Sequence, residues 1–189
     1  MIAAMRRAWP VVLLFSLWSR PACAQTVFEL SGGYSLAHDP RDAVTLPAGW
    51  FAGAAIRLTP ALWAVADVSG QYATIALFDT DARLTAHSLM GGLRLSARLG
   101  RLTEFGQVLA GIVRTSGSAF GATTSGQSIG VQPGAGIDYP LTPTWSARAE
   151  VDIRLMTAQP DAQNGGHQYR FVAALVYSIR RHESPRTAP

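Results

Sequence analysis

The sequence predicts an all-β chain that forms an eight-stranded antiparallel up-and-down barrel spanning a membrane. Three observations lead to this prediction: alternation of apolar and polar side chains in segments of about ten residues, connections that alternate between long and short, and an N-terminal segment of the secretory type. Successive side chains of a strand point to opposite faces, so each segment has an apolar and a polar face. No stretch beyond residue 24 approaches the roughly 18 consecutive apolar residues of a membrane-spanning helix.

Residues 1–24 are expected to be a signal peptide. Arg6 and Arg7 precede an apolar stretch over residues 8–18, and Ala22-Cys23-Ala24 supplies the small residues of an A-x-A cleavage site. Cleavage after Ala24 removes the chain's single cysteine, so the mature chain is expected to contain no thiol and no disulfide. Lipidation of Cys23 is the alternative, although Arg20 stands where a lipoprotein signal has a large apolar residue.

The charge of the chain is concentrated at its ends. The chain contains no Lys, and its formal charge of +4 falls to +1 when Arg6, Arg7 and Arg20 leave with the signal peptide. This balance argues against a nucleic-acid surface. The remaining length allows one domain, which we assign to residues 25–179, followed by a short Arg-rich tail over residues 180–189 that is expected to be periplasmic.

Each expected strand is close to the length that a tilted membrane strand needs. The eight strands are expected at Val27–Leu36, Trp50–Leu58, Leu62–Tyr72, Thr85–Ala97, Glu104–Arg114, Ser128–Tyr139, Trp145–Met156 and Gln168–Ile179. The long connections are His38–Gly49, Ala73–Leu84, Thr115–Gln127 and Thr157–His167, and the short ones are Thr59–Ala61, Arg98–Thr103 and Pro140–Thr144. Long loops at one end and tight turns at the other are typical of an outer-membrane barrel.

The polar faces of these strands carry charges of both signs. They hold six acids and six arginines: Glu29, Asp67, Glu104, Asp138, Glu150 and Asp152, with Arg57, Arg94, Arg114, Arg148, Arg154 and Arg170. We expect these twelve side chains to pair inside the lumen, because an isolated buried charge costs several kcal/mol. The apolar faces, among them Phe105, Leu109 and Val113, are expected to contact lipid.

A soluble barrel is the alternative, with the apolar faces inside and the charges outside. Aromatic residues at strand ends favour the membrane barrel, because Trp and Tyr gather where a membrane meets water. These residues are Tyr34, Trp50, Tyr72, Trp145 and Tyr177.

One part of the sequence resembles a known group of proteins. Residues 134–139, Gly-Ala-Gly-Ile-Asp-Tyr, with the short turn and the strand Trp145–Arg154 that follow, resemble two strands of small bacterial outer-membrane β-barrel proteins of the OmpA/OmpX-like, eight-stranded group. Residues 168–177 resemble the closing strand of that group, although ten residues follow Ile179 where the group usually ends on an aromatic residue. The resemblance implies a monomer in the outer membrane of a Gram-negative-type bacterium. Outer-membrane lipid, lipopolysaccharide and the barrel-assembly machinery are then its partners.

The sequence predicts no catalytic, cofactor or metal site. His38, His87, His167 and His182 lack the spacing of metal ligands. His87-Ser88 invites comparison with lipid A deacylases, but neighbouring residues of a strand face opposite sides. The carboxylates are interleaved with arginines, which favours ion pairs over acid catalysis. The Gly-rich stretch over residues 117–130 is expected to be a flexible loop rather than a phosphate cradle.

These expectations point to a non-enzymatic outer-membrane protein. It is expected to contribute to membrane integrity or to surface contact, binding an extracellular ligand through its long loops. A lipid A-modifying barrel enzyme and a small channel are the alternatives. Eight strands leave an interior that side chains can just fill, which argues against the channel.

Overall fold

The computed structural model describes residues 27–40, 44–77, 80–119, 122–157 and 166–180. The expected signal peptide and the tail beyond Arg180 lie outside the described residues. No helix in the described part of the chain is long and apolar enough to cross a membrane.

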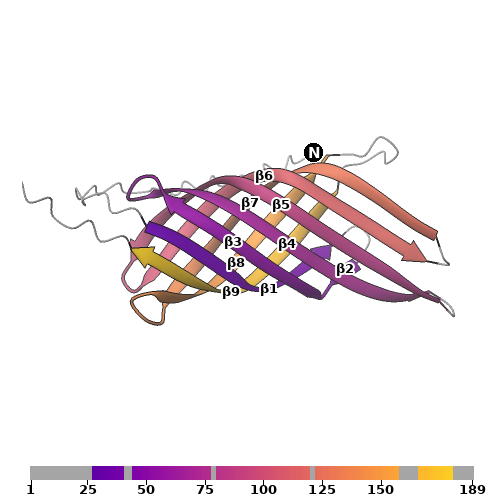
Figure 1. Cartoon of the computed structure of the whole chain (residues 1–189), viewed down its shortest axis with the longest axis horizontal. Helices are drawn as coiled ribbons and strands as arrows, with labels where there is room; N and C mark the ends of the chain where they lie inside the picture. Colours follow the sequence, from indigo (N-terminus) through magenta and orange to yellow (C-terminus); the bar gives the residue numbers. More distant parts are fainter. Residues whose placement is uncertain (1–26, 41–43, 78–79, 120–121, 158–165, 181–189) are drawn as a thin grey trace, which may run out of the picture.

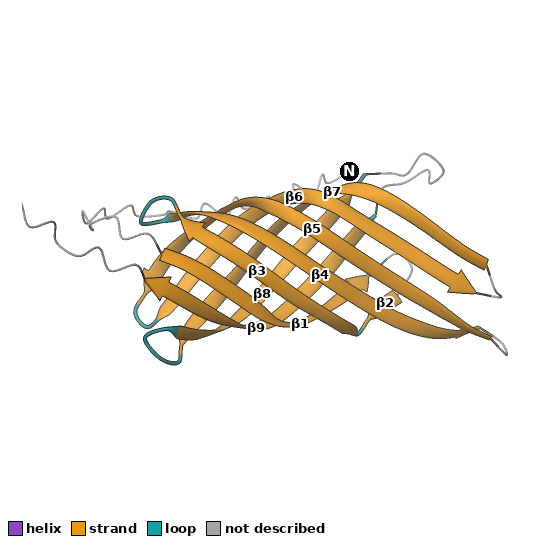
Figure 2. Ribbon diagram, in the orientation of Figure 1, coloured by secondary structure: helices purple, strands orange, loops and turns teal. Residues whose placement is uncertain are grey.

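Eight antiparallel strands form a closed barrel (Figure 1 and Figure 2). They are β1 (Val27–Asp39), β3 (Ala48–Arg57), β4 (Leu62–Leu77), β5 (Thr80–Leu99), β6 (Leu102–Ala119), β7 (Ala122–Pro140), β8 (Trp145–Met156) and β9 (His167–Arg180). Each strand pairs with its neighbours in chain order, and β1 closes the barrel by pairing with β9 from Val27–Arg180 to His38–Tyr169. A short strand, β2 (Val44–Leu46), pairs with the end of β1. The predicted fold class and strand number are confirmed.

The connections agree with the prediction at one end of the barrel only. The short turns close on their own hydrogen bonds: Thr59 Oγ1 accepts from the amide of Leu62 at 3.0 Å, and Thr142 Oγ1 accepts from the amide of Trp145 at 2.9 Å. Gly100 supplies the positive φ, 61°, that the turn between β5 and β6 requires.

At the other end, the second and third predicted long loops are almost entirely strand, and the first, His38–Gly49, contains the end of β1, the short strand β2 and the start of β3. The pairing of β4 with β5 continues to Leu77–Thr80, and that of β6 with β7 continues to Ala119–Ala122. The predictions of loops over residues 73–84 and 115–127, and of a flexible Gly-rich loop, are therefore wrong. The apolar alternation stops where the membrane-facing belt stops, but backbone hydrogen bonds carry the strands further, since pairing needs no apolar side chain. Most of the fourth expected loop, residues 158–165, lies outside the described residues.

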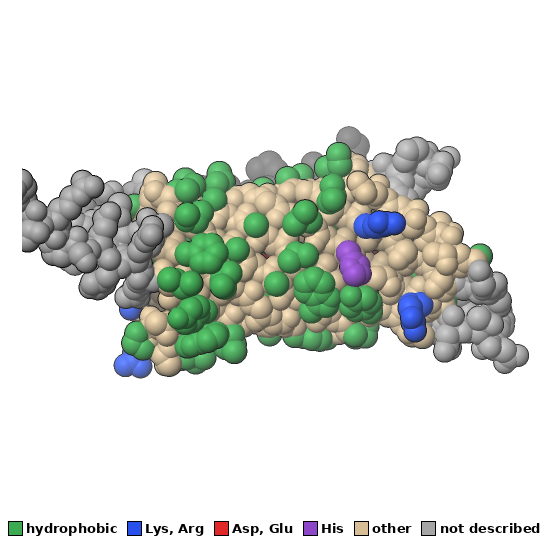
Figure 3. All heavy atoms as spheres, viewed as in Figure 1, with side chains coloured by type: hydrophobic (Ala, Val, Ile, Leu, Met, Phe, Trp, Pro, Cys, Tyr) green, Lys and Arg blue, Asp and Glu red, His purple; other side chains and the backbone are tan. Residues whose placement is uncertain are grey.

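The outer wall is apolar around the barrel, and Figure 3 shows this belt on one face. Leu30, Leu89, Val108, Val151 and Phe171 are between 45% and 57% exposed, so side chains that would form the core of a soluble protein face outward. The five aromatic residues predicted for the interfaces are all outward, at 36–49% exposure: Tyr34, Trp50, Tyr72, Trp145 and Tyr177. The arrangement is that of a membrane barrel and not of a soluble one.

The predicted facing of the strand over residues 104–114 is wrong. Phe105, Leu109 and Val113 are 5%, 0% and 1% exposed and lie inside the barrel, whereas Glu104 and Arg114 are on the outer wall. This strand is apolar on both faces, and its charges stand only near the ends of the apolar belt, where an outward charge costs little. Gln107, at the centre of the strand and buried in the lumen, shares the face of Phe105 and Leu109.

Candidate functional site in the barrel lumen

Polar side chains fill the middle of the barrel in three layers, and Gln107 joins the central layer to the one nearer the short turns by hydrogen bonds to Glu150 and Arg94. All the predicted lumen charges except Glu104 and Arg114 point inward, which leaves five acids and five arginines inside. They come from every strand of the barrel wall except β6, which contributes Gln107 and Phe105 instead.

The central layer is built around the guanidinium of Arg170 on β9. Its Nη1 and Nη2 donate to the two oxygens of Asp67 at 3.2 and 2.7 Å, and its Nε donates to Asp152 Oδ2 at 2.8 Å. Nη2 also donates to Glu150 Oε1 at 3.0 Å, an oxygen that accepts from Gln107 Nε2 at 2.9 Å. One cation thus gathers three carboxylates that would otherwise repel one another in a dry interior.

The layer nearer the short turns contains two arginines stacked on an aromatic ring. The guanidinium carbons of Arg94 and Arg148 are 4.5 and 4.7 Å from the ring centroid of Phe105. Arg148 donates to both oxygens of Asp138 at 2.7 and 2.8 Å, and both arginines lie 3.6 Å from Glu29. Phe105 therefore contacts each of these two like charges through a cation–π interaction.

The layer nearer the long hairpins is built around Arg154, whose partners are neutral. Its Nε and Nη1 donate to the amide oxygens of Gln132 and Gln168 at 2.9 and 3.3 Å, and Nη2 donates to Ser88 Oγ at 3.0 Å. Ser88 and Ser69 are hydrogen-bonded at 2.7 Å. No carboxylate of the described residues forms an ion pair with Arg154, so its guanidinium is held by neutral oxygens alone.

The filled part of the lumen leaves little free volume. A void of about 10 Å³ lies beside Glu150 and Asp67, which is room for roughly one water. Three buried side-chain atoms of the described lumen lack a hydrogen-bond partner: Glu150 Oε2, which lies at this void, and Gln71 Oε1 and Gln132 Nε2, which lie elsewhere in the plug. This packing closes the barrel interior as a polar plug rather than an open pore.

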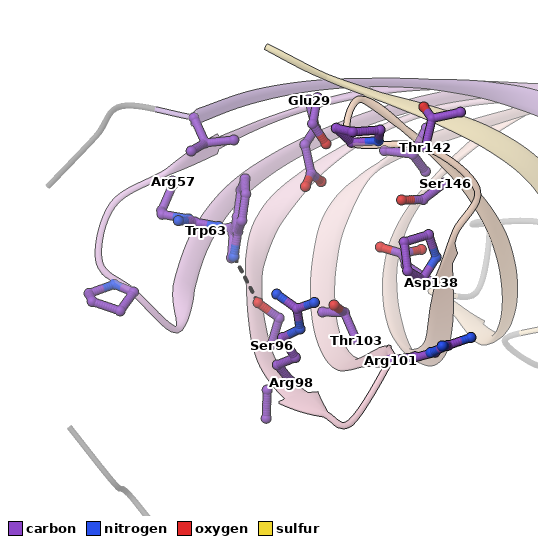
Figure 4. Close-up of a pocket in the computed structure, with 17 residues that line it drawn as sticks. Glu29, Arg57, Trp63, Ser96, Arg98, Arg101, Thr103, Asp138, Thr142 and Ser146 are labelled. Carbon is purple, nitrogen blue, oxygen red and sulfur yellow. Dashed lines mark hydrogen bonds between the residues drawn. The ribbon is translucent and has the colours of Figure 1, made fainter. Parts of the chain in front are cut away.

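A cavity of about 310 Å³ opens between the short turns (Figure 4). Arg57, Arg98 and Arg101 lie around it together with Glu29 and Asp138, so its wall carries both signs of charge. Trp63 closes one side, donating from Nε1 to Ser96 Oγ at 2.8 Å, with the guanidinium of Arg57 over its ring at 4.6 Å.

A second cavity of about 390 Å³ opens between the long hairpins. Its wall includes Val44, Leu46, Leu84 and Ala86, which belong to a small apolar cluster around β2. Gln168, a partner of Arg154, lies at the boundary between this apolar mouth and the polar plug.

The residues weighed as chemical groups are not brought together. His87 is on the outer wall and exposed, while Ser88 is inside and 4% exposed, as the alternation predicts, so they cannot act as a pair. No group of three or more His, Cys, Asp or Glu side chains in the described part of the chain could hold a metal ion. The three carboxylates around Arg170 are held as acceptors by its guanidinium, an arrangement suited to structure rather than proton transfer.

Sequence reasoning missed the apolar members of the plug. Phe51 lies inside, with the guanidinium carbon of Arg170 at 5.3 Å from its ring centroid, and Phe105 lies inside in contact with Arg94 and Arg148. The sequence did contain an indication of this inward direction. Phe105 shares its face with Gln107, and Phe51 shares its face with Gly53, and a polar or small residue is not favoured on a lipid-facing surface.

The closed eight-stranded barrel is the fold of several small outer-membrane proteins. Neisserial surface protein A matches with a TM-score of 0.63 at 14% identity, over 80% of this chain and 96% of that one. A major outer membrane protein of Thermus thermophilus matches with a TM-score of 0.59 at 12% identity, over 82% of this chain and 99% of that one. The attachment invasion locus protein Ail of Yersinia pestis matches with a TM-score of 0.55 at 11% identity, over 82% of this chain and 98% of that one.

These likenesses concern the fold, because the identities are low. No protein-family model matches the chain, and no curated relative does. The resemblance to small eight-stranded outer-membrane barrels that the sequence suggested is confirmed at the level of the fold.

Proposed function

We propose that this protein is an integral outer-membrane barrel without enzymatic activity, which strengthens the membrane and carries two long hairpins beyond its outer surface. The observation that carries the proposal is the combination of a lipid-facing apolar belt with a lumen closed by the Arg170 layer. The barrel folds of Neisserial surface protein A and Ail support the location.

The hairpins are the parts that reach furthest from the belt. β4 with β5 and β6 with β7 continue as paired ribbons past the last large apolar outward residues, Leu89 and Ile112 (Figure 1). Their outward side chains, such as Thr123 and Ser125, are exposed and hydroxyl-bearing. Paired ribbons offer a more ordered surface than free loops, which suits contact with an extracellular partner.

The polar plug argues against the channel alternative. An ion crossing the barrel would have to displace hydrogen bonds among Arg170, Asp67, Glu150 and Asp152, which are all 0–3% exposed. The apolar belt surrounds the barrel and leaves no polar lateral interface, so we propose a monomer that the barrel-assembly machinery inserts.

Heat-modifiable migration tests the proposal. Protein extracted from outer-membrane fractions should migrate differently on a gel before and after boiling, since a folded membrane barrel resists detergent until it is heated. Recovery of the protein in the soluble periplasmic fraction, with identical migration of boiled and unboiled samples, would rule out the membrane barrel. The unboiled sample of the Val151→Arg variant provides a control for failed insertion.

A further inference from the structure

The apolar belt ends at one sharp line across three neighbouring strands. Leu89 of β5, Ile112 of β6 and Ile129 of β7 are paired side by side, all outward and 43–63% exposed. The next outward positions toward the hairpins are His87, Arg114 and Gln127, which are also paired side by side. A step of two residues along a strand is about 7 Å, so the wall changes from apolar to polar within one side-chain layer.

This polar row carries positive charge that the described protein leaves unpaired. Arg114 is exposed, and no hydrogen bond or ion pair joins it to another described residue. Arg83 stands two outward positions beyond His87 on the same strand, and it is exposed too. Figure 3 shows basic side chains and a histidine beyond the apolar belt on the face that carries β4, β5 and β6.

The row adjoins the aromatic residues of the belt. The ring of His87 packs edge-on against Tyr72 of β4, with centroids 5.6 Å apart, and the Tyr72 hydroxyl accepts from Trp50 Nε1 at 3.2 Å. Trp and Tyr on a membrane protein lie at the level of the lipid headgroups. Arg114 therefore stands at headgroup depth, where an outward charge is tolerated far better than at the membrane centre.

We propose that this polar row binds a phosphate group of lipopolysaccharide in the outer leaflet. The row consists of His87, Arg114 and Gln127, with Arg83 nearer the tip of the hairpin. The guanidinium of Arg114 would hold the phosphate, the His87 ring and the Gln127 amide would supply further donors, and the acyl chains would lie against Leu89, Ile112 and Ile129. A guanidinium fork matches phosphate oxygens geometrically, and a phosphate monoester carries more charge than the diester of a phospholipid.

The site depends on the proposed membrane insertion, because the row lies at headgroup depth only if the belt lies in lipid. The hairpin end is the outer end in that proposal, so the leaflet facing the row is the one that contains lipopolysaccharide. On the opposite side of the belt, β6 presents an acid, Glu104, as its outward charge. On β6, the outward charge therefore differs in sign between the two ends of the belt.

Lipid titration of the folded protein in nonionic detergent micelles tests the site. Four probes are compared by native mass spectrometry: bisphosphorylated lipid A, dephosphorylated lipid A, phosphatidylglycerol and inorganic phosphate. The wild type should bind bisphosphorylated lipid A most tightly, and Arg114→Gln should weaken this binding about tenfold, as expected for loss of a charge-assisted pair. Arg114→Lys should recover part of it, whereas Arg101→Gln, at the opposite end, should bind as the wild type does.

Each outcome of this titration either supports the lipopolysaccharide site or contradicts it. Equal binding of lipid A with and without phosphate, or by wild type and Arg114→Gln, would overturn the site. Binding of inorganic phosphate as tight as that of lipid A would indicate a soluble-anion site, and preference for phosphatidylglycerol would indicate a phospholipid site; both contradict the proposal. Heat-modifiable migration of every variant is checked first, so that failure of insertion, which concerns the proposed function, is separated from failure of lipid binding.

Discussion

Arg170 of β9 and Asp67 of β4 form a two-point ion pair across the lumen, with N–O distances of 3.2 and 2.7 Å. The two residues are 103 positions apart in the sequence, and two strands, β1 and β3, lie between theirs in the barrel wall. Arg170 therefore ties distant parts of the wall together, while its Nε holds Asp152 on the adjacent strand β8.

Removal of this guanidinium should be among the most damaging changes in the plug. Arg170→Met would leave Asp67, Glu150 and Asp152 buried together without their shared cation. We expect a loss of about 3–5 kcal/mol in the free energy of unfolding, measured by urea titration in liposomes, because an uncompensated buried charge is strongly destabilising.

Arg154→Met is the matched control for that change. Arg154 is equally buried, but its partners are neutral oxygens of Gln132, Gln168 and Ser88. We expect a smaller loss of about 1–3 kcal/mol, the usual range for hydrogen bonds to a charged group. Equal losses for the two variants would show that burial, and not the three carboxylates, decides the cost.

Gly134 tests how tightly the plug packs against the wall. A Cβ on Gly134 would overlap Asp152 Oδ1, the oxygen beside the one that accepts from Arg170. Gly134→Ala should displace Asp152 and destabilise the barrel by about 1–3 kcal/mol, as overpacking commonly does. Gly106→Ala, where the nearest atom is 4.0 Å away, should change stability by less than about 1 kcal/mol. The same urea titration compares them, and a harmless Gly134→Ala would contradict the packing described.

The strand Trp145–Met156 shows how far the sequence alone reaches. Its polar residues alternate without a break, so its bounds and the inward direction of Arg148, Glu150, Asp152 and Arg154 are predictable and are confirmed. Alternation fixes which face a residue shares, since the period of a strand is two. It says nothing about which residues meet across the lumen, because that depends on register and closure.

The strand that contains Phe105 shows where such reasoning fails. Apolar residues occupy both of its faces, so the pattern has no preferred direction, and the charges at its ends, Glu104 and Arg114, suggested the wrong one. The inner face is the one whose side chains have partners in the lumen: the Phe105 ring contacts Arg94 and Arg148, and the Gln107 amide joins Arg94 to Glu150. Central positions therefore determine facing better than terminal ones, where a charge reaches water from either face.

Val151 tests the assignment of the outer wall. It is 46% exposed and stands in the apolar belt between Glu150 and Asp152, which face inward. Val151→Arg should make insertion less favourable by about 2–4 kcal/mol, because it places a charge in lipid near the membrane centre. Glu150→Gln should cost less, since the amide keeps an oxygen that can accept from Arg170. Folding yield in liposomes ranks the two, and a reversed order would show that the faces are misassigned.

The plug also predicts electrical behaviour. Planar bilayers containing purified protein should show no stable large conductance, because the Arg170 and Arg154 layers fill the lumen of an eight-stranded barrel. Arg170→Met provides a comparison in which the central layer is broken. Long-lived, reproducible single-channel steps from the wild type would contradict the filled lumen and favour the channel.

Labelling of single-cysteine variants determines which end of the barrel faces the outside of the cell. An even number of strands returns the chain to its starting side, so the described ends near Val27 and Arg180 and the three short turns share one side, expected to be the periplasm. The hairpins then lie outside the cell. Ser125 is exposed on β7 beyond the belt and is the outer position, and Thr142, in the turn before β8, is the inner one. Gln163 lies outside the described residues and is expected to be a second outer position from the sequence alone.

Ser125→Cys and Gln163→Cys should react with a membrane-impermeant thiol reagent on intact cells, and Thr142→Cys should react only after the outer membrane is breached. The expected mature chain has no other thiol, so the background is low. Ser125 is solvent-exposed on a paired ribbon, so its reaction reports access rather than unfolding. Labelling of Thr142→Cys on intact cells, with Ser125→Cys protected, would invert the barrel. It would also place the row of His87, Arg114 and Gln127 in the inner leaflet, away from lipopolysaccharide, so one experiment tests both the exposure of the hairpins and the position of the lipid site.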